Sequence, residues 1–364
     1  MAAIIPAYVQ PDFTLPELVQ APRVKVVPVP MDGVVPDNYH GTSNFPEYLN
    51  LGAGDWLLVP ESRMDSVLVL SGRQVEVVEA RRVKQGDQVV VGRTENGEEG
   101  IYVHTTGFDS AASAGIDKFV FRTRGTRETP FSRSYDELYE VLRHDRDHGH
   151  IAWVLGPAVA FDKDSRDAMQ GIIDSGYCHS LMAGNALATH DLEAAYFCTG
   201  LGQDIYTRQL KPMGHYNHLD IINAVRRAGS IKQAIKELNL HNGIIYACEE
   251  KQVPYVLAGS IRDDGPLPEV IADVYQAQDA MRKYARQATT VIAMATQLHS
   301  IAFGNMVPSY RVMEDNSVRP VFFYIIDMTE FSVDKLANRG SAQAVAILTN
   351  AQDFMMNLWN NLKA

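Results

Sequence analysis

The chain has 364 residues, of which 46% are hydrophobic and 21% charged, and its formal net charge at pH 7 is −11. This length predicts two domains, or one large domain with an appendage, and an acidic balance without a long basic run argues against nucleic-acid binding. No stretch approaches 18 uninterrupted apolar residues, and the amino terminus lacks a basic region followed by an apolar run, so we expect neither a membrane span nor a signal peptide. The three cysteines have no paired spacing, which predicts buried thiols in a reducing compartment and a cytoplasmic location.

Residues 1–108 are predicted to form a β-rich domain. Short apolar runs alternate there with Gly-, Asn- and Asp-containing turns, which is typical of antiparallel strands. The expected strands are Val24–Val27, Asp65–Leu70, Gln74–Val78, Gln88–Val91 and Gly100–His104. Residues 109–118 begin with small and polar side chains and are predicted to be a linker.

Residues 119–364 alternate between helical and strand patterns, which predicts an α/β domain with a parallel sheet covered on both faces. The expected helices are Phe131–His148, Asp164–Ser175, Asp191–Phe197, His218–Arg227, Ile231–Leu238, Val270–Gln287, Glu330–Asn338 and Asp353–Leu362. The expected strands are Ile151–Leu155, Ser180–Ala183, Tyr255–Leu257, Thr290–Ala295, Val321–Ile326 and Ala344–Leu348.

Five of these strands end in small or polar residues. The five ends are Gly156-Pro157, Gly184-Asn185, Gly259-Ser260, Thr296 with His299, and Asp327. Because the carboxyl ends of parallel strands lie at one edge of a sheet, these residues are expected to meet in one crevice. Glycine with hydroxyl, amide and carboxylate groups suits a dinucleotide, whose pyrophosphate approaches the backbone and whose ribose accepts hydrogen bonds. The alternative is that any α/β sheet carries such residues where its loops begin.

The usual dinucleotide and nucleoside-triphosphate motifs are missing. The sequence has no P-loop, and Gly200-Leu201-Gly202 follows a predicted helix and lacks the third glycine of a G-x-G-x-x-G motif. His144, His148 and His150 have spacing that zinc sites use, but they lie among alternating charges, which favours a solvated helix end. We expect no metal site.

The stretch from Val253 to Pro268 combines a buried strand with charged residues at its carboxyl end. Asp263 and Asp264 are adjacent and would repel each other unless a cation or a hydrogen-bond donor lies between them. This pair is a candidate site for an amine, and a solvated acidic turn closed by Pro266 and Pro268 is the alternative. Two polar runs of the first domain, residues 37–40 and 61–65, are candidates for lining a substrate pocket.

Several longer runs resemble one known family. The runs at 36–40, 61–65, 92–95 and 99–104 resemble the conserved domain named after the plant lysine-ketoglutarate reductase/saccharopine dehydrogenase (LOR/SDH). The runs at 182–191, 226–230, 258–268, 276–282 and 339–341 resemble the ornithine cyclodeaminase part of the cyanobacterial arginine dihydrolase/ornithine cyclodeaminase and its archaeal stand-alone relatives. The chain starts just before the cyclodeaminase part, so the dihydrolase activity is expected to be absent.

The resemblance implies a Rossmann-like, deoxyhypusine-synthase-like domain that binds NAD, and the conversion of L-ornithine to L-proline and ammonia with a hydride taken up and returned. Within this scheme the predicted cofactor-binding residues are Gly156, Pro157, Gly184, Asn185, Ala186, Asp191, Gly259, Ser260, Asn305 and Asp327. The predicted catalytic residues are Asp264, Asp263, His299, Glu61 and Asp65. The predicted substrate-binding residues are Asn38, His40, Arg63, Thr94 and Arg262.

Three alternatives to this activity stay open. The chain could be a cyclodeaminase for lysine or a related diamino acid, an amino-acid dehydrogenase that releases NADH, or a non-catalytic sensor of NAD or amino acids. The expected partner is a small diamino acid, without nucleic acid or membrane, and the chain is expected to form a homo-oligomer.

Overall fold

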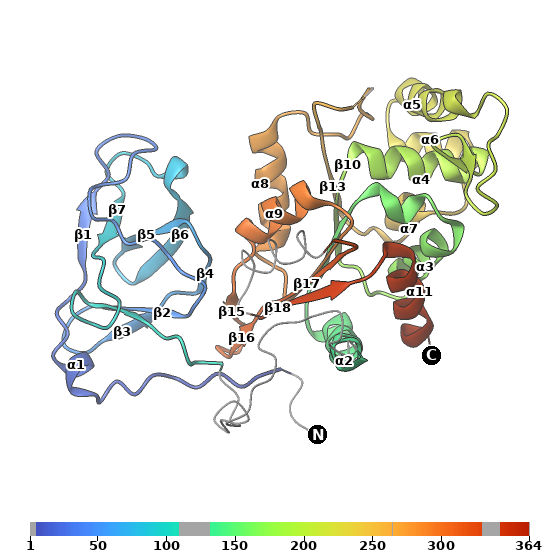
Figure 1. The fold of residues 1–364 in the computed structure, drawn as a ribbon. Coiled ribbons are helices and arrows are strands. Elements are labelled where there is room, and N and C mark those ends of the chain that lie inside the picture. Colours follow the sequence, from blue (N-terminus) through green and yellow to red (C-terminus); the bar gives the residue numbers. More distant parts are fainter. Residues whose placement is uncertain (1–4, 109–131, 264, 330–342, 364) are drawn as a thin grey trace. The chain divides into compact units, whose positions relative to one another are not determined.

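The computed structural model describes residues 5–108, 132–263, 265–329 and 343–363. These residues fold into two compact units (Figure 1). The first unit contains residues 5–108 together with Val307–Val321, and the second contains residues 132–306, 322–329 and 344–363. The predicted linker at 109–118 and the predicted helix Glu330–Asn338 lie outside the described residues.

The first unit consists mainly of short antiparallel strands. Its elements are α1 (Pro16–Val19), β1 (Lys25–Pro28), β2 (Glu47–Asn50), β3 (Trp56–Leu58), β4 (Glu61–Ser62), β5 (Ser66–Ser71), β6 (Gln74–Glu79), η1 (Ala80–Arg82), β7 (Gln88–Val91), β8 (Ile101–Val103), β15 (Tyr310–Val312) and β16 (Val318–Pro320). They form a four-stranded sheet in the order β1-β7-β5-β6 and two three-stranded sheets in the orders β3-β2-β8 and β16-β15-β4.

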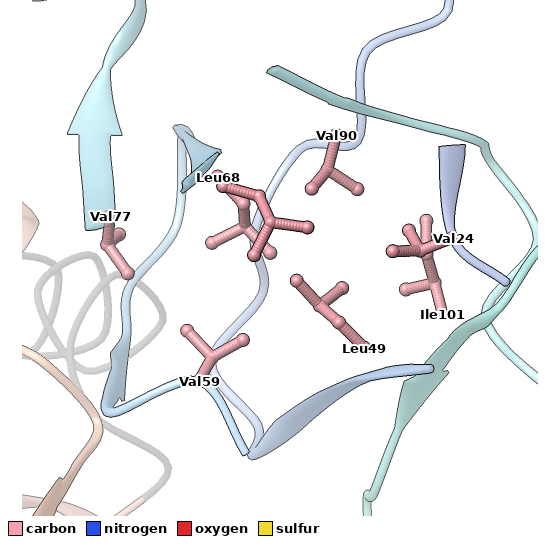
Figure 2. Close-up of a cluster of buried hydrophobic side chains, with 8 residues drawn as sticks. Val24, Leu49, Val59, Leu68, Val77, Val90 and Ile101 are labelled. Carbon is pink, nitrogen blue, oxygen red and sulfur yellow. The ribbon is translucent and has the colours of Figure 1, made fainter. Parts of the chain in front are cut away.

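The core of the first unit lies between two of these sheets. Leu68, Val77 and Val90 come from the four-stranded sheet, and Leu49 and Ile101 come from the sheet of β2 and β8. Figure 2 shows these side chains pointing toward one another. Burial of each such side chain contributes about 1.5–3 kcal/mol, so alternating apolar residues fix the faces of both sheets.

The second unit contains a six-stranded sheet in the order β13-β10-β9-β14-β17-β18. Its strands are β9 (Ile151–Leu155), β10 (Ser180–Gly184), β13 (Tyr255–Ala258), β14 (Thr290–Met294), β17 (Phe322–Asp327) and β18 (Gln343–Leu348). The pairs from β13 through β17 are all parallel. Every residue of β9 and β14 is buried, as expected for strands covered on both faces.

Helices flank this sheet on both sides, with α3, α4, α7 and α11 on one side and α8 and α9 on the other (Figure 1). The helices of the second unit are α2 (Ser132–His148), η2 (Pro157–Ala160), α3 (Lys163–Asp174), α4 (Asn185–Phe197), η3 (Gly214–Tyr216), α5 (Asn217–Ala228), α6 (Ile231–Glu237), α7 (Ile244–Lys251), α8 (Val274–Ala285), α9 (Gln297–Met306) and α11 (Ala351–Leu362). A small hairpin of β11 (Thr199–Gly200) and β12 (Gln203–Asp204) follows α4. None of the described helices is long and apolar enough to cross a bilayer.

Capping residues explain where several helices begin and end. Asp162, Ser230 and Asp273 accept hydrogen bonds from backbone N–H groups in the first turns of α3, α6 and α8. The cap at Asp273 starts α8 four residues later than the pattern predicted. Gly229, at φ +84°, ends α5 in the left-handed conformation that glycine adopts without strain.

Candidate functional site

The strand order of the second unit creates a switch point beside β9. From β9 the chain runs to β10 and β13 on one side, and it returns to β14 and β17 on the other. In open α/β sheets of this order, ligands bind at the carboxyl ends of the strands where the direction reverses. The predicted crevice therefore lies where the loops after β9, β10, β13 and β14 begin.

Gly156 makes the loops after β9 and β14 touch. Its N–H donates to the carbonyl oxygen of Met294 at 2.9 Å. A Cβ on Gly156 would lie 1.9 Å from the carbonyl oxygen of Ala295, so no larger residue fits without moving the backbone. Pro157 follows directly and begins the short helix η2.

The amino terminus of α4 lies at the end of β10. Gly184 precedes the helix, no side chain caps it, and its first turn carries no acidic residue. The N–H groups at the start of a helix attract anions, especially phosphate groups. The side chain of Asn185 instead accepts from the N–H of Leu267 at 3.0 Å, which fixes the loop after Gly265 against α4. The first turn, including Ala186, therefore suits a phosphate.

His299 lies beside this helix end. It belongs to the first turn of α9, and its Nδ1 lies 3.2 Å from Oγ1 of Thr296. A Cβ on Gly184 would lie 2.8 Å from Cε1 of His299, so the imidazole occupies the space that a side chain at Gly184 would need. Burial lowers the pKa of His299, and the charge of Asp263 raises it to a smaller extent. The ring is therefore neutral near pH 7.

Asp263 closes the turn that follows β13. Its Oδ2 accepts from the N–H of Ser260 at 2.8 Å, and its own N–H donates to the carbonyl oxygen of Ser260 at 3.1 Å. Gly259 donates its N–H to the carbonyl oxygen of Ile271 at 2.9 Å, which joins this loop to the segment that precedes α8. The structure thus brings Gly184, His299 and Asp263 into one neighbourhood, whereas Asp264 lies outside the described residues.

Three other predicted cofactor residues lie on α4, on α9 and at the end of β17. Asp191 is fully buried, and its carboxylate accepts from Nε of Arg166 at 2.7 Å and from the N–H groups of Ile244 and Ile245 at 3.0 and 2.8 Å. These bonds join α3, α4 and α7, which is a structural role. Asn305 is exposed near the far end of α9, roughly 9 Å along the helix from His299. Asp327 ends β17, where its Oδ1 accepts from the N–H and hydroxyl of Thr329.

The predicted residues of the first unit fall into buried and exposed groups. Glu61, His40 and Arg63 are buried, and His40 Nε2 lies 2.9 Å from Oε2 of Glu47. Arg63 lies 3.5 Å from Glu61. Asn38, Asp65 and Thr94 are exposed at turns, and the hydroxyl and N–H of Thr94 donate to Glu99. Arg262, in the second unit, is exposed as well.

The histidine cluster does not gather into a metal centre. His144 lies 2.8 Å from the buried carboxylate of Asp145, and Nε2 of His150 lies 2.9 Å from the hydroxyl of Ser180. Asp145 also accepts from the hydroxyls of Thr289 and Thr290, at the amino ends of the central strands. In the described part of the chain, no three His, Cys, Asp or Glu side chains lie close enough to hold a metal ion.

The sequence motifs did not single out two arginines of the first unit, Arg311 and Arg319. They lie on β15 and β16, in the returning segment Val307–Val321, where Arg311 lies opposite Glu61 on β4 and opposite Arg319 on β16. A local signal was present. Apolar and basic residues alternate on both sides of the turn-forming run at 315–317, which is typical of a hairpin.

Known proteins share this architecture and sequence. A family model described as arginine dihydrolase ArgZ-like, C-terminal, Rossmann fold matches residues 136–358. The ornithine cyclodeaminase of Methanopyrus kandleri is 38% identical over 347 residues, which cover 95% of this chain and 80% of that protein. The chain belongs to the ornithine cyclodeaminase family.

Solved structures of this family agree with the fold. A LOR/SDH protein from Methanococcus maripaludis is 34% identical, with a TM-score of 0.83, over 94% of this chain and 98% of that one. The ternary complex of AgrE with ornithine and NAD+ is 29% identical, with a TM-score of 0.58, over 96% of this chain and 47% of AgrE. The predicted family and the predicted fold class, a β-rich part with a Rossmann-like parallel sheet, are confirmed.

Proposed function

We propose that this chain is an NAD-dependent ornithine cyclodeaminase that converts L-ornithine to L-proline and ammonia. The observation that carries the proposal is the uncapped amino terminus of α4 at the switch point of the sheet, with His299 beside it. The sequence similarity to archaeal ornithine cyclodeaminases and the ornithine and NAD+ in the AgrE complex support the choice of substrate and cofactor.

The residues at this edge fit a dinucleotide. Gly156 and Gly184 have no side chain where the loops approach most closely, and the first turn of α4 offers N–H groups to a pyrophosphate. Gly259 and Ser260 begin the neighbouring loop after β13 and are within the same sheet edge. When bound, NAD supplies a hydride acceptor that becomes a hydride donor.

His299 is the residue we assign to proton transfer. A neutral imidazole accepts a proton from a substrate ammonium, and its lowered pKa keeps it neutral at physiological pH. Thr296 orients the ring through Nδ1, so that Nε2 and Cε1 face the loop at Gly184. Asp263 lies close enough to stabilise the imidazolium that forms. A role for Asp264 in holding the δ-amine stays a prediction.

The test of the proposal is a product balance. The purified protein is incubated with ornithine and an amount of NAD far below that of the substrate, and proline, ammonia and NADH are measured over time. We expect proline and ammonia in equal amounts, with NADH never exceeding the enzyme concentration. NADH that rises with ammonia would identify an amino-acid dehydrogenase, and lack of turnover of ornithine, lysine and related diamino acids would refute an enzymatic role.

Other predictions stay open at this point. They are the domain boundaries at residues 108 and 118, the cytoplasmic location, the homo-oligomer, and the lack of nucleic-acid and membrane partners.

A further inference from the structure

Large apolar side chains are exposed on the segment of the second unit that leads from α4 into the first turn of α5 (Figure 1). The described residues of the chain expose 20 large apolar side chains, and six of them lie in this short segment, with exposed fractions of 39–80%. We call these six side chains the hairpin surface: Leu201, Tyr206, Leu210, Met213, Tyr216 and Leu219. Single exposed apolar residues are normal on a protein surface, whereas such a concentration marks an interaction site.

Hydrogen bonds and close backbone contacts hold this segment in one shape. The carboxylate of Glu193 on α4 accepts from the hydroxyl of Thr199 at 2.8 Å and from the N–H of Gly202 at 3.2 Å. The N–H of Lys211 donates to the carbonyl oxygen of Gly202 at 3.1 Å. A Cβ on Gly202 would lie 2.7 Å from the carbonyl carbon of Gly214, so the turn at Leu201 rests directly on the turn at Met213. Because the segment is already ordered, binding a partner costs little conformational entropy.

Two residues of the hairpin surface occupy backbone positions that do not suit them. Leu201 and Gly202 form the two-residue turn between β11 and β12, with φ of +52° and +77°, and Met213 has a φ of +59°. Asn-Gly is the favoured pair in a hairpin turn with two positive φ angles. A leucine and a methionine in the left-handed region carry strain, and their exposure to water is unfavourable as well. An apolar contact with a partner would offset both costs.

The charges around the hairpin surface balance. Residues 199–219 contain three Asp, Glu, Lys or Arg side chains, namely Asp204, Arg208 and Lys211. Nζ of Lys211 lies 3.1 Å from Oδ2 of Asp204, and Nη2 of Arg208 lies 3.7 Å from Oδ1 of Asp162 on the neighbouring α3 loop. A membrane surface or a nucleic acid attracts an excess of Lys and Arg, which these paired residues do not provide. The surface is thus neutral on a chain whose net charge is −11.

A second copy of the chain fits this surface. At about 200 Å² for a fully exposed large side chain, the six side chains expose roughly 700 Å², and a standard interface buries about 800 Å² on each partner. Two acidic chains repel each other except where their surfaces are neutral, and a two-fold axis brings the same surface of both copies together. We propose that two copies of this chain associate through the hairpin surface. This inference does not depend on the proposed activity.

Substitutions at the two strained turns test the interface without endangering the fold. The variants are Leu201→Asn and Met213→Asn, since asparagine adopts the left-handed conformation more readily than leucine or methionine. Met31→Asn in the first unit is the matched control, because Met31 is 59% exposed and Met213 is 63% exposed. Sedimentation equilibrium of the full chain measures the Kd of association at physiological ionic strength, and urea unfolding checks that each variant is folded.

We expect the wild-type chain to associate and each turn variant to raise the Kd at least about hundredfold. A two-fold interface contains each substitution twice, and each lost apolar contact weakens association about tenfold. The control associates as the wild type does. High salt leaves the wild-type association intact, because no ion pair contributes to it. If the wild type forms a larger assembly, the variants lose one association step.

Four outcomes would overturn the inference. The first is a wild-type chain that stays monomeric at all concentrations measured. The second is a Kd that is the same in the turn variants, the control and the wild type, because the copies would then associate through another surface. The third is dissociation of the wild type by high salt, which indicates an ion-paired interface. The fourth is sedimentation of the wild type, but not of the turn variants, with anionic phospholipid vesicles, which would assign the hairpin surface to a membrane.

Discussion

At Gly184, a single methyl group would reach the ring of His299. A Cβ added at this glycine would lie 2.8 Å from Cε1, and the imidazole would have to swing away. We expect Gly184→Ala to lower kcat/KM for ornithine by at least about tenfold, which corresponds to about 1.4 kcal/mol, with little loss of stability because a side-chain end can move. Steady-state kinetics and thermal unfolding test this. Gly41→Ala is the control, since its Cβ would make only an ordinary contact with Tyr39 at 3.8 Å. Equal kinetics for the two variants would contradict the assignment of His299.

The pH profile tests the same residue through its charge. Burial lowers the pKa of His299, so the neutral base is present above that pKa and activity is lost as the pH falls through it. In a plot of kcat/KM against pH, the fall on the acidic side is therefore expected at a pH below the usual pKa range of histidine. Asp263→Asn removes the charge that raises this pKa, so this fall should move to still lower pH. If activity of Asp263→Asn is lost at the same pH as in the wild type, the charge of Asp263 does not act on His299.

Among the elements, α3, α4 and α7 are held together by one buried carboxylate. Asp191 accepts from Arg166 and from two backbone N–H groups of α7, with less than a tenth of either side chain exposed. We expect Asp191→Asn to reduce the free energy of unfolding by about 3–5 kcal/mol, because Arg166 is left as an uncompensated buried charge. Urea unfolding measures this. Asp167→Asn, which removes an exposed pair with Lys163 on α3, should cost less than about 1 kcal/mol. Similar losses in both variants would show that burial is not the decisive factor.

How far the elements could be predicted from the sequence depends on the range of their contacts. The strand at Ile151–Leu155 was predicted with its observed bounds because a strand buried on both faces reads as a continuous apolar run. Helix α4 begins at Asn185, earlier than the predicted Asp191, because its buried polar residues hide the helical period. The pairing of β15 with β4 joins residues about 250 positions apart, and no local pattern encodes such a contact.

Site residues that local patterns place could likewise be predicted, whereas those that depend on contacts between distant parts of the sequence could not. Gly156, Gly184 and His299 could be found because strand ends of a parallel sheet share one edge. The position of Arg311 opposite Glu61 could not, because it depends on the pairing of β15 with β4. Asp191 was predicted from its position in a motif, whereas its burial and its bonds to α7 follow from tertiary packing.

At the scale of the whole molecule, NAD should stabilise the second unit. A ligand that binds only the folded state adds about 2.7 kcal/mol at a hundredfold excess over its Kd. Trp56→Phe leaves the fluorescence of Trp153 and Trp359, both in the second unit, as a probe of its unfolding. We expect NAD to shift this transition to higher urea concentration. An unchanged midpoint at saturating NAD and NADP would contradict a dinucleotide site in this unit.

The most direct test of the central claim follows one hydrogen atom through the reaction. Ornithine with deuterium at Cα is converted in ordinary water with NAD far below the substrate concentration, and the proline is examined by mass spectrometry. If the hydride leaves Cα and returns to the same carbon within one active site, the proline retains the deuterium at Cα. Proline that has lost the label to water, or label that accumulates in free NADH, would contradict internal hydride recycling by this protein.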